Sequence, residues 1–193
     1  PESALHILQC LRADGYHIEG LPDSSAQLIE ALKAGPTNAG WQGRIATHHL
    51  SLSDYQQRFT ALPEEVREAI LARWGAPEKD PMSDGSRFYL PLLSYGNAFV
   101  GVQPARGYQI DPKASYHSPD LVPPHHYLAF YFYLREQVNI DAVMHVGKHG
   151  NLEWLPGKAL ALSQACLPEA ILGPIPHLYP FIVNDPGEGA QAK

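Results

Sequence analysis

The sequence predicts an α/β protein with a parallel or mixed sheet, flanking helices and long loops. Stretches with apolar residues at helical spacing alternate with short apolar runs that are typical of buried strands. From residue 123 to residue 184 the predicted order is helix, strand, loop, helix, strand, which favours a parallel sheet with right-handed crossovers. The chain has 18 prolines and 16 glycines, concentrated after residue 75, and these predict long connecting loops.

The first predicted part, residues 1–75, is a helix-rich α/β segment. Its spacing of apolar residues predicts a helix over 3–13, a short strand over 15–22, a helix over 23–35 and two helices within 52–75. Residues that suit the starts and ends of these helices are Asp23 or Ser24, Gly35, Ser53, Pro63 and Gly75.

The second predicted part, residues 76–193, is an α/β core. Its predicted elements are a polar linker over 76–86, two extended segments around Tyr95-Gly96-Asn97, a long loop over 107–122, a helix over 123–139, a buried strand over 140–146, a short helix over 158–168 and a buried strand over 179–185. The residues expected on the buried face of the helix over 123–139 are Tyr127, Leu128, Tyr131, Leu134 and Val138.

Composition and charge exclude several classes of protein. The formal net charge is −6 and no lysine or arginine cluster occurs, so a nucleic-acid partner is not expected. The longest apolar runs are far too short to span a membrane, and no signal peptide is visible, which predicts a cytoplasmic protein. Cys10 and Cys166 are far apart and outside any C-x-x-C motif, so we expect reduced thiols buried in the core. Both chain ends read as cut, which suggests a piece of a longer protein.

The stretch "MHVGKHGNLEWLPGK", residues 144–158, has the composition of a chemical site. Its two Gly-Lys pairs do not form a phosphate loop, because Ala142 and Leu152 stand where a Walker A motif needs glycine. Neither Lys148 nor Lys158 is followed by serine or threonine. Nucleotide hydrolysis by this chain is therefore not expected.

The same stretch contains a candidate metal or proton-transfer site. His145, His149 and Glu153 follow each other at intervals of four, but three glycines and a proline argue against one continuous helix. We expect His145 at the carboxyl end of a strand, with His149 and Glu153 on the loop after it, where α/β sheets commonly bind ligands. Imidazole and carboxylate groups suit both a divalent transition metal and acid–base chemistry. Taken singly, His145 and Glu153 would more often be structural, but three such groups together with Lys148 on one glycine-rich loop favour a chemical site.

Further candidates lie before this stretch. His125 and His126 follow two prolines at the start of a predicted helix, where they could bind a ligand or lie exposed to solvent. The loop "QPARGYQIDPKASYHSPD" contains Arg106, Tyr108 and Lys113, a combination that suits a flat ligand with carboxylates but that an ordinary turn-rich loop could also have. His48 and His49 have no carboxylate or glycine loop nearby, and we interpret them as structural or exposed.

The motifs resemble those of one family. The segments "GVQPARGYQIDPKASYH", "PPHHYLAFYFYLREQ", "HVGKHGNLEWLPGKALALS" and "PHLYPFIVNDPGEGAQAK" are similar to the large subunits of the ATP-dependent tetrapyrrole chelatases. This family comprises the large cobaltochelatase subunit CobN and the H subunit of magnesium chelatase. The resemblance is densest over residues 101–193, and its pattern H-x-G-x-H-G-x-L-E-[WF]-x-P-G-K is long and specific. "HVGKHG" with Lys148 favours the cobalt branch, because the magnesium branch usually has threonine at that position.

The resemblance implies insertion of Co(II) into hydrogenobyrinic acid a,c-diamide on the aerobic route to cobalamin. It implies an AAA+ ATPase subunit and a companion subunit that use ATP and Mg(II), which this chain would not bind. It also implies a subunit far longer than 193 residues, so that the isolated piece is expected to be inactive.

The roles expected from the resemblance are as follows. Glu153 and His149 would transfer protons, and His145 or His149 would hold the metal transiently. Substrate contacts would come from Lys148, Arg106, Tyr108, Lys113, His125 and His126.

Three alternatives remain at this point. The chain could serve insertion of Mg(II) into protoporphyrin IX, it could be a non-catalytic tetrapyrrole-binding scaffold, or it could be a simple metalloenzyme with His145, His149 and Glu153 as ligands.

Overall fold

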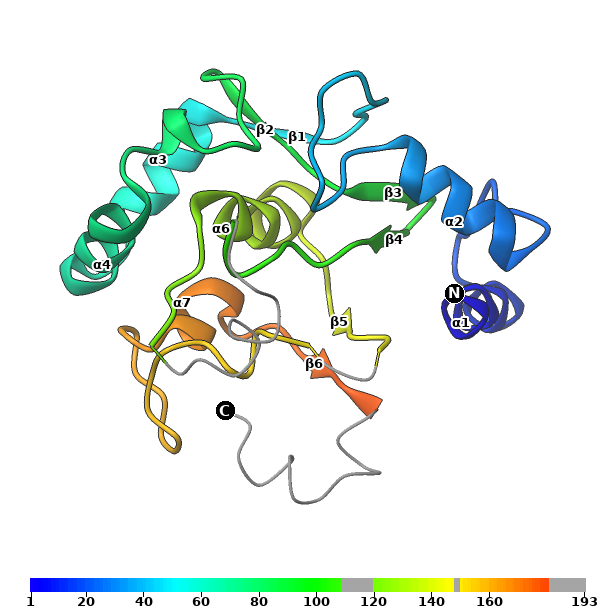
Figure 1. Cartoon of the computed structure of the whole chain (residues 1–193). Coiled ribbons are helices and arrows are strands. Elements are labelled where there is room, and N and C mark those ends of the chain that lie inside the picture. Colours follow the sequence, from blue (N-terminus) through cyan, green and yellow to red (C-terminus); the bar gives the residue numbers. More distant parts are fainter. Residues whose placement is uncertain (109–119, 148–149, 181–193) are drawn as a thin grey trace. The chain divides into compact units, whose positions relative to one another are not determined.

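The computed structural model describes residues 1–108, 120–147 and 150–180 (Figure 1). They form helices and small two-stranded sheets joined by long loops, which confirms the predicted α/β class. Two compact units are present, one of Pro1–His49 with Tyr89–Pro104 and one of Leu50–Phe88 with Ala105–Lys193. Each unit combines early and late parts of the chain, so the division differs from the predicted one at residues 75 and 76.

The first unit is built from two helices and a β-hairpin. Its elements are α1 (Glu2–Ala13), α2 (Ser25–Ala34), β3 (Leu92–Tyr95) and β4 (Ala98–Gly101). The strands pair antiparallel around the predicted turn, with Leu92 opposite Gly101 and Tyr95 opposite Ala98. The buried core of this unit consists of Leu5, Leu8, Ile18, Leu28 and Tyr95.

Local signals placed the helix α2 correctly, but the predicted strand over 15–22 is absent. The Ser24 hydroxyl accepts a hydrogen bond from the Gln27 amide and begins α2, and Gly35 ends it. Residues 15–22 form turns and irregular backbone, with Ile18 buried in the core. The segment has a single buried apolar position and so lacks the alternation that stabilises a strand.

The second unit is centred on a helix that is buried on every side. Its helices are α3 (Leu52–Thr60), α4 (Glu64–Trp74), the 3₁₀ turn η1 (Pro77–Lys79), α6 (His125–Phe132), the π-helix η2 (Tyr133–Val138) and α7 (Leu167–Leu172). All eight residues of α6 are buried, and α3 and α7 both contact it (Figure 1). The residues predicted on the buried face are buried, except Val138, which is half-buried, and neighbouring elements cover the remaining positions of α6 as well.

Two helix boundaries differ from the predicted ones. The cap of α3 is Ser51 rather than Ser53, because the Ser51 hydroxyl accepts from the Asp54 amide at 3.0 Å. The helix predicted over 158–168 is instead α7, which begins at Leu167 with Pro168 in its first turn. The preceding residues fold into turns around the Cys166 sulfur, which accepts from the amides of Lys158 and Ser163 at 3.3 Å each.

Short strands complete the architecture. β1 (His49–Ser51) pairs with β2 (Arg87–Tyr89), and β5 (Val143–Met144) pairs with β6 (His177–Leu178). The second pair is parallel, with Val143 opposite His177 and Met144 opposite Leu178. Only two residues of the strand predicted over 179–185 lie within the described residues, and neither belongs to β6. No helix within the described ranges is both long and apolar enough to cross a membrane.

Candidate functional site

Polar aromatic side chains gather where the parallel pair β5–β6 ends. His145 follows β5 and Tyr179 follows β6, and the register continues with His145 opposite Tyr179. Residues two apart on a strand share a face, so both side chains lie on the same side as His177. The ring centroid of His145 lies 4.9 Å from that of Tyr179 and 6.1 Å from that of His177. The chain therefore presents two imidazoles and a phenol at one end of the pair.

Gly150 allows a histidine and a carboxylate to approach this end of the sheet together. A Cβ atom built on Gly150 would lie 2.7 Å from His145 Nδ1 and 2.9 Å from Glu153 Oε2. A side chain at this position would force the His145 ring or the Glu153 carboxylate to shift, so glycine lets both groups keep these positions. The Gly150 amide donates to the Tyr179 hydroxyl at 2.8 Å and so ties the loop to the strand end. His145 and Glu153 thus meet where a strand passes into a loop, and their chemical roles stay predictions.

Glu153 lies in a buried polar environment. Its side chain is only 5% exposed, and the neighbouring Asn151 is buried and accepts from the Tyr127 hydroxyl at 2.6 Å. Burial lowers the pKa of Arg106, and the nearby Tyr127 and Glu153 partly offset that shift by attracting the guanidinium charge. Arg106 nevertheless keeps its proton at neutral pH. A buried carboxylate thus lies near a permanent positive charge.

The remaining members of the predicted site fall elsewhere. His149, Lys148 and Lys113 lie outside the described residues. In the ranges that the structure does describe, no group of three or more His, Cys, Asp or Glu side chains could hold a metal ion. The structure therefore brings together two of the three predicted metal and proton-transfer residues, His145 and Glu153.

His125 is held inside the protein by two hydrogen bonds. Its Nδ1 lies 2.6 Å from the Tyr55 hydroxyl and its Nε2 lies 2.9 Å from the Gly75 carbonyl oxygen. A carbonyl only accepts, so Nε2 carries the proton and Nδ1 accepts from the Tyr55 hydroxyl. Burial lowers the pKa of His125, although the Gly75 carbonyl and the charges of Asp80 and Glu78 partly offset the shift.

A second buried carboxylate, Asp80, organises the same region. Its Oδ1 accepts from the Tyr108 hydroxyl at 2.8 Å and from the Met82 amide at 2.9 Å. Its Oδ2 accepts from the His126 amide at 3.0 Å, at the start of α6. Burial, followed by the charge of Asp80, raises the pKa of Tyr108 far above its ordinary value. The segment 76–86 is therefore more than the predicted polar linker, since it places an anion inside the unit.

These contacts bear on the predicted substrate-binding residues. His125 is fully buried and His126 is 2% exposed, so the alternative of a solvated helix start was wrong. Arg106 is also 2% exposed, and its Nη2 donates to the Leu121 carbonyl at 2.9 Å. Protein groups thus hold Arg106, Tyr108, His125 and His126, and this geometry gives no support to their direct contact with substrate.

The residues that we interpreted as structural have ordinary surroundings. The His48 ring packs edge-on against Phe99 at 5.5 Å, and His49 is exposed. Burial, followed by the charge of His49, lowers the pKa of His48. Cys10 and Cys166 are both free thiols, as predicted, but only Cys166 is buried; Cys10 is exposed on α1, so its expected place in the core was wrong.

Sequence reasoning missed four residues that shape these regions: Gly150, Asn151, Tyr179 and Asp80. A signal existed for three of them. Gly150 and Asn151 belong to the "HGNLEW" motif, and Tyr179 opens a run that was predicted as a neighbouring strand. Asp80 had no signal, because a "KDP" triplet in a polar stretch looks like an ordinary surface turn.

Comparison with known proteins identifies relatives over the whole chain. It is 57% identical to the aerobic cobaltochelatase subunit CobN of Pseudomonas aeruginosa over 195 residues and 55% identical to that of Sinorhizobium sp over 193 residues. These matches cover 100% of this chain but 16% and 15% of the relatives. The magnesium-chelatase H subunit of Rhodobacter capsulatus is also similar, at 31% identity over 192 residues, covering 100% of this chain and 16% of that relative.

A solved structure agrees with these sequence matches. The catalytic subunit of cobaltochelatase from Mycobacterium tuberculosis superposes with a TM-score of 0.82 at 40% identity, covering 99% of this chain and 17% of that one. The family described as CobN/Magnesium Chelatase matches residues 1–193. The chain thus spans about a sixth of the length of the relatives that it matches, and it belongs to the CobN/Magnesium Chelatase family.

Proposed function

We propose that this chain is part of the large subunit of an ATP-dependent cobaltochelatase, which inserts Co(II) into a corrin precursor. The observation that carries the proposal is the meeting of His145 and Glu153 around Gly150. Cobalt is a substrate of this reaction, and no resident metal is required. The expected corrin is hydrogenobyrinic acid a,c-diamide, as the similarity to aerobic CobN subunits suggests. A cytoplasmic location remains a prediction.

The chemistry of metal insertion calls for groups of this kind. A metal can enter a tetrapyrrole only if it loses water ligands and if the ring nitrogens lose their protons. A carboxylate can accept such protons, and a neutral imidazole can hold a divalent metal weakly on its way to the ring. We assign proton transfer to Glu153 together with His149, and transient metal contact to His145 or His149.

The buried surroundings of Glu153 suit this role. Arg106 and Tyr127 lie near the carboxylate, in a region where water is largely excluded. Electrostatic interactions are stronger in such a region than in water, so these neighbours can hold the carboxylate in place. We therefore reassign Arg106 from the substrate's carboxylates to the support of Glu153. Lys148 and Lys113 remain the proposed partners of the carboxylates at the rim of the macrocycle.

We propose cobalt rather than magnesium as the inserted metal because this chain is more similar in sequence to cobaltochelatase subunits than to the magnesium-chelatase H subunit of Rhodobacter capsulatus. The relatives named as cobaltochelatase subunits are 55% and 57% identical, against 31% for the magnesium-chelatase relative of Rhodobacter capsulatus. We propose that an AAA+ ATPase subunit and a companion subunit supply the ATP-driven step. A competition between a corrin and a porphyrin, read by absorbance on the full-length subunit, would distinguish cobalt from magnesium chemistry.

The decisive experiment is a cobalt-insertion assay with the full-length subunit and its partner subunits. Glu153→Gln keeps the size of the side chain but removes its ability to accept a proton as a carboxylate, so turnover should fall at least about a hundred-fold. His149→Ala should also reduce turnover. Tetrapyrrole binding, measured by absorbance, should stay within a factor of about three of wild type if the loss lies in the chemical step.

Glu169→Gln is the matched control, because Glu169 is a half-buried glutamate on α7 outside the site. It should leave turnover unchanged. Wild-type turnover in Glu153→Gln would remove Glu153 from the mechanism. Loss of tetrapyrrole binding together with turnover would instead favour the scaffold alternative.

A further inference from the structure

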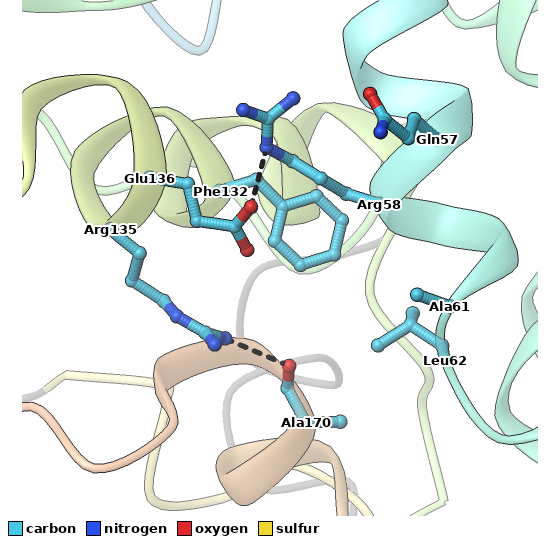
Figure 2. A pocket seen from close by; sticks show the side chains of 8 residues that line it. All are labelled: Gln57, Arg58, Ala61, Leu62, Phe132, Arg135, Glu136 and Ala170. Atoms are coloured by element: carbon cyan, nitrogen blue, oxygen red, sulfur yellow. Dashed lines mark hydrogen bonds and ion pairs between the residues drawn. The ribbon is translucent and has the colours of Figure 1, made fainter.

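A pocket of about 380 Å³ lies within the second unit, between α3, η2 and α7 (Figure 2). Its charged lining residues are Arg58, Arg135 and Glu136, and Phe132 and Leu62 contribute apolar surface. None of the lining residues belongs to the site around Gly150. The volume falls within the range of small-molecule sites.

The helix that supplies two of the three charged residues has an unusual geometry. Arg135 and Glu136 belong to η2, a six-residue π-helix that continues α6. π-Helical turns are rare, and they occur frequently at functional sites because the wider turn interrupts regular helix packing. The position of this π-helix beside the pocket therefore favours a ligand-binding site there.

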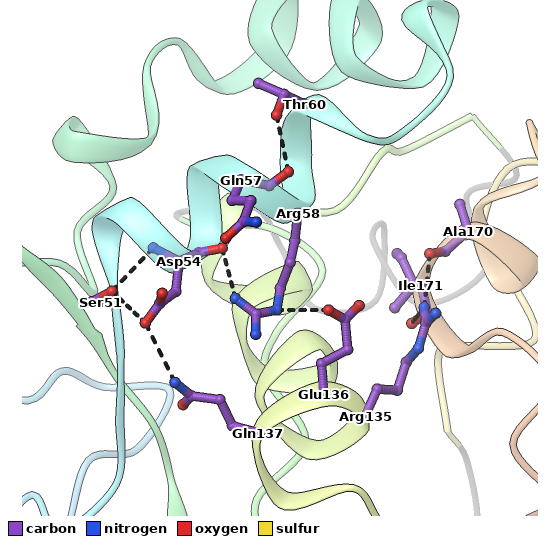
Figure 3. A network of polar contacts seen from close by, with 10 residues as sticks. All are labelled: Ser51, Asp54, Gln57, Arg58, Thr60, Arg135, Glu136, Gln137, Ala170 and Ile171. Carbon is purple, nitrogen blue, oxygen red and sulfur yellow. Dashed lines mark hydrogen bonds and ion pairs between the residues drawn. The ribbon is translucent and has the colours of Figure 1, made fainter.

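Arg135 is held in one orientation by the main chain of α7. Its Nη1 donates to the carbonyl oxygens of Ile171 at 2.8 Å and Ala170 at 3.2 Å (Figure 3). The guanidinium also lies against Gly173, where a Cβ atom would come within 3.0 Å of Nη2. Because these contacts already order the Arg135 side chain, a ligand that binds it would pay little conformational entropy.

The charge of Arg135 is not balanced by a nearby carboxylate. Arg58 forms an ion pair with Glu136, whose Oε2 lies 2.9 Å from Arg58 Nε, and Arg58 Nη1 also donates to the Asp54 carbonyl at 2.8 Å (Figure 3). Across the parts of the chain that the structure describes, no Asp or Glu oxygen lies within 4.0 Å of the Arg135 nitrogens. Two guanidiniums and one carboxylate leave the pocket with one positive charge.

We propose that this pocket binds a carboxylate group carried on a short, partly apolar body. Nη1 of the Arg135 guanidinium donates to α7, and the N–H groups of Nη2 and Nε match the geometry of a carboxylate. Phe132, which is 1% exposed, and Leu62 provide the surface for the apolar body. The carboxylate comes either from a free small molecule or from an acidic side chain of a partner polypeptide.

The first arm of the test measures the binding of succinate to the full-length subunit by isothermal titration calorimetry. The variants Ala61→Glu and Ala61→Gln place side chains of equal size at the pocket wall, and only glutamate adds a negative charge. We expect saturable binding that weakens at least about ten-fold more in Ala61→Glu than in Ala61→Gln. Arg135→Gln should abolish binding, and Arg135→Lys should weaken it, because lysine keeps the charge but loses the fork.

Arg12→Gln on α1 is the control, since it removes an exposed positive charge far along the chain from the pocket residues. Thermal unfolding of each variant shows whether Arg135 substitutions act through the loss of the α7 contacts. The Ala61 pair does not touch those contacts, so it tests the proposal even if the Arg135 variants fail to fold.

The second arm addresses a carboxylate from a partner polypeptide and rests on the proposed chelatase function. It measures the affinity of the full-length subunit for its partner subunits. A loss of about ten-fold in Ala61→Glu but not in Ala61→Gln would assign the carboxylate to a partner. Equal behaviour of the two variants in both arms would overturn the pocket proposal and leave the cobalt-insertion assay unaffected.

Discussion

The two polar clusters of the second unit differ in how their groups are used. At the start of α6, His125 and Asp80 are buried and Tyr108 is half-buried, and their hydrogen bonds go to other protein groups. At the end of β5, His145 is half-buried and lies with the buried Glu153 around a glycine that has no room for a side chain. Both clusters contain a histidine and a carboxylate, and the sequence predicted a site role for a histidine of each, His125 and His145.

The comparison shows that residue type alone does not identify a chemical site. A buried histidine with both ring nitrogens engaged is fixed in one tautomer and contributes to stability. A histidine at a strand end beside a glycine-containing loop can reach a ligand. We therefore expect changes at α6 to affect unfolding and changes at β5 to affect turnover.

The largest expected effect is that of Gly150→Ala on turnover. The added Cβ must displace the His145 ring or the Glu153 carboxylate, and a displacement of about 1 Å can cost about a hundred-fold in rate. Cobalt insertion by the full-length subunit measures the loss. Gly35→Ala is the control, because its Cβ meets only the Ile45 carbonyl at 3.3 Å and the Leu32 carbonyl at 3.6 Å. Full activity in Gly150→Ala would refute the observed approach of the two groups.

The second effect concerns stability rather than turnover. Asp80→Asn keeps the shape of the side chain but removes the charge that accepts from Tyr108, Met82 and His126. We expect the free energy of unfolding to fall by about 2 kcal/mol, as for other hydrogen bonds to charged groups. Urea unfolding of the chain measures it. Asp84→Asn, in an exposed turn, should have a smaller effect. Equal losses would mean that burial of Asp80 does not matter.

The third effect is smaller and again falls on turnover. Tyr179→Phe keeps the ring against His145 but removes the hydroxyl that accepts from the Gly150 amide. The loop should become less well positioned, and one hydrogen bond of about 1 kcal/mol corresponds to roughly a five-fold loss in kcat. The KM for the tetrapyrrole should not change. A change in KM with constant kcat would place Tyr179 in substrate binding instead.

The smallest effect is a change in pH dependence. The pKa of His125 is lowered from 6.5 in the folded protein, chiefly by burial, so the unfolded chain binds a proton more readily. The contribution of neutral His125 to the free energy of unfolding is therefore fully present above about pH 6.5. It is lost as the pH falls below that value and through the lower pKa of the folded state. His125→Gln can keep both hydrogen bonds without titrating, so its melting temperature should fall less on acidification.

His6→Gln is the control for this measurement, because His6 is exposed on α1. It should keep the full acid sensitivity of the wild type. If His125→Gln retains that sensitivity too, His125 is not the group responsible. His48 and His177 also have pKa values lowered by burial, so the loss of sensitivity is expected to be partial.

Prediction succeeded where the determining interactions were local. Ser24 begins α2 and Gly35 ends it, and Gly96 allows the hairpin turn with a φ of +66°. It failed at the strand over 15–22 and at the helix over 158–168, where contacts distant in sequence decide the backbone. The Asn97 amide donates to the His17 carbonyl at 2.8 Å, and the Cys166 sulfur gathers the loop that precedes α7.

The sequence by itself determined the α/β class, most helix boundaries and the strand-to-loop placement of His145 and Glu153. These follow from spacing, caps and glycine positions, which act over a few residues. Only the tertiary structure decided that His125, His126 and Arg106 are buried, and that Asp80 accepts hydrogen bonds from the half-buried Tyr108 and from the His126 amide. Burial depends on which distant segments pack together, and no local pattern carries that information. The same physical reason explains why Tyr179 and Gly150 became recognisable as parts of the site only after folding placed the two strand ends side by side.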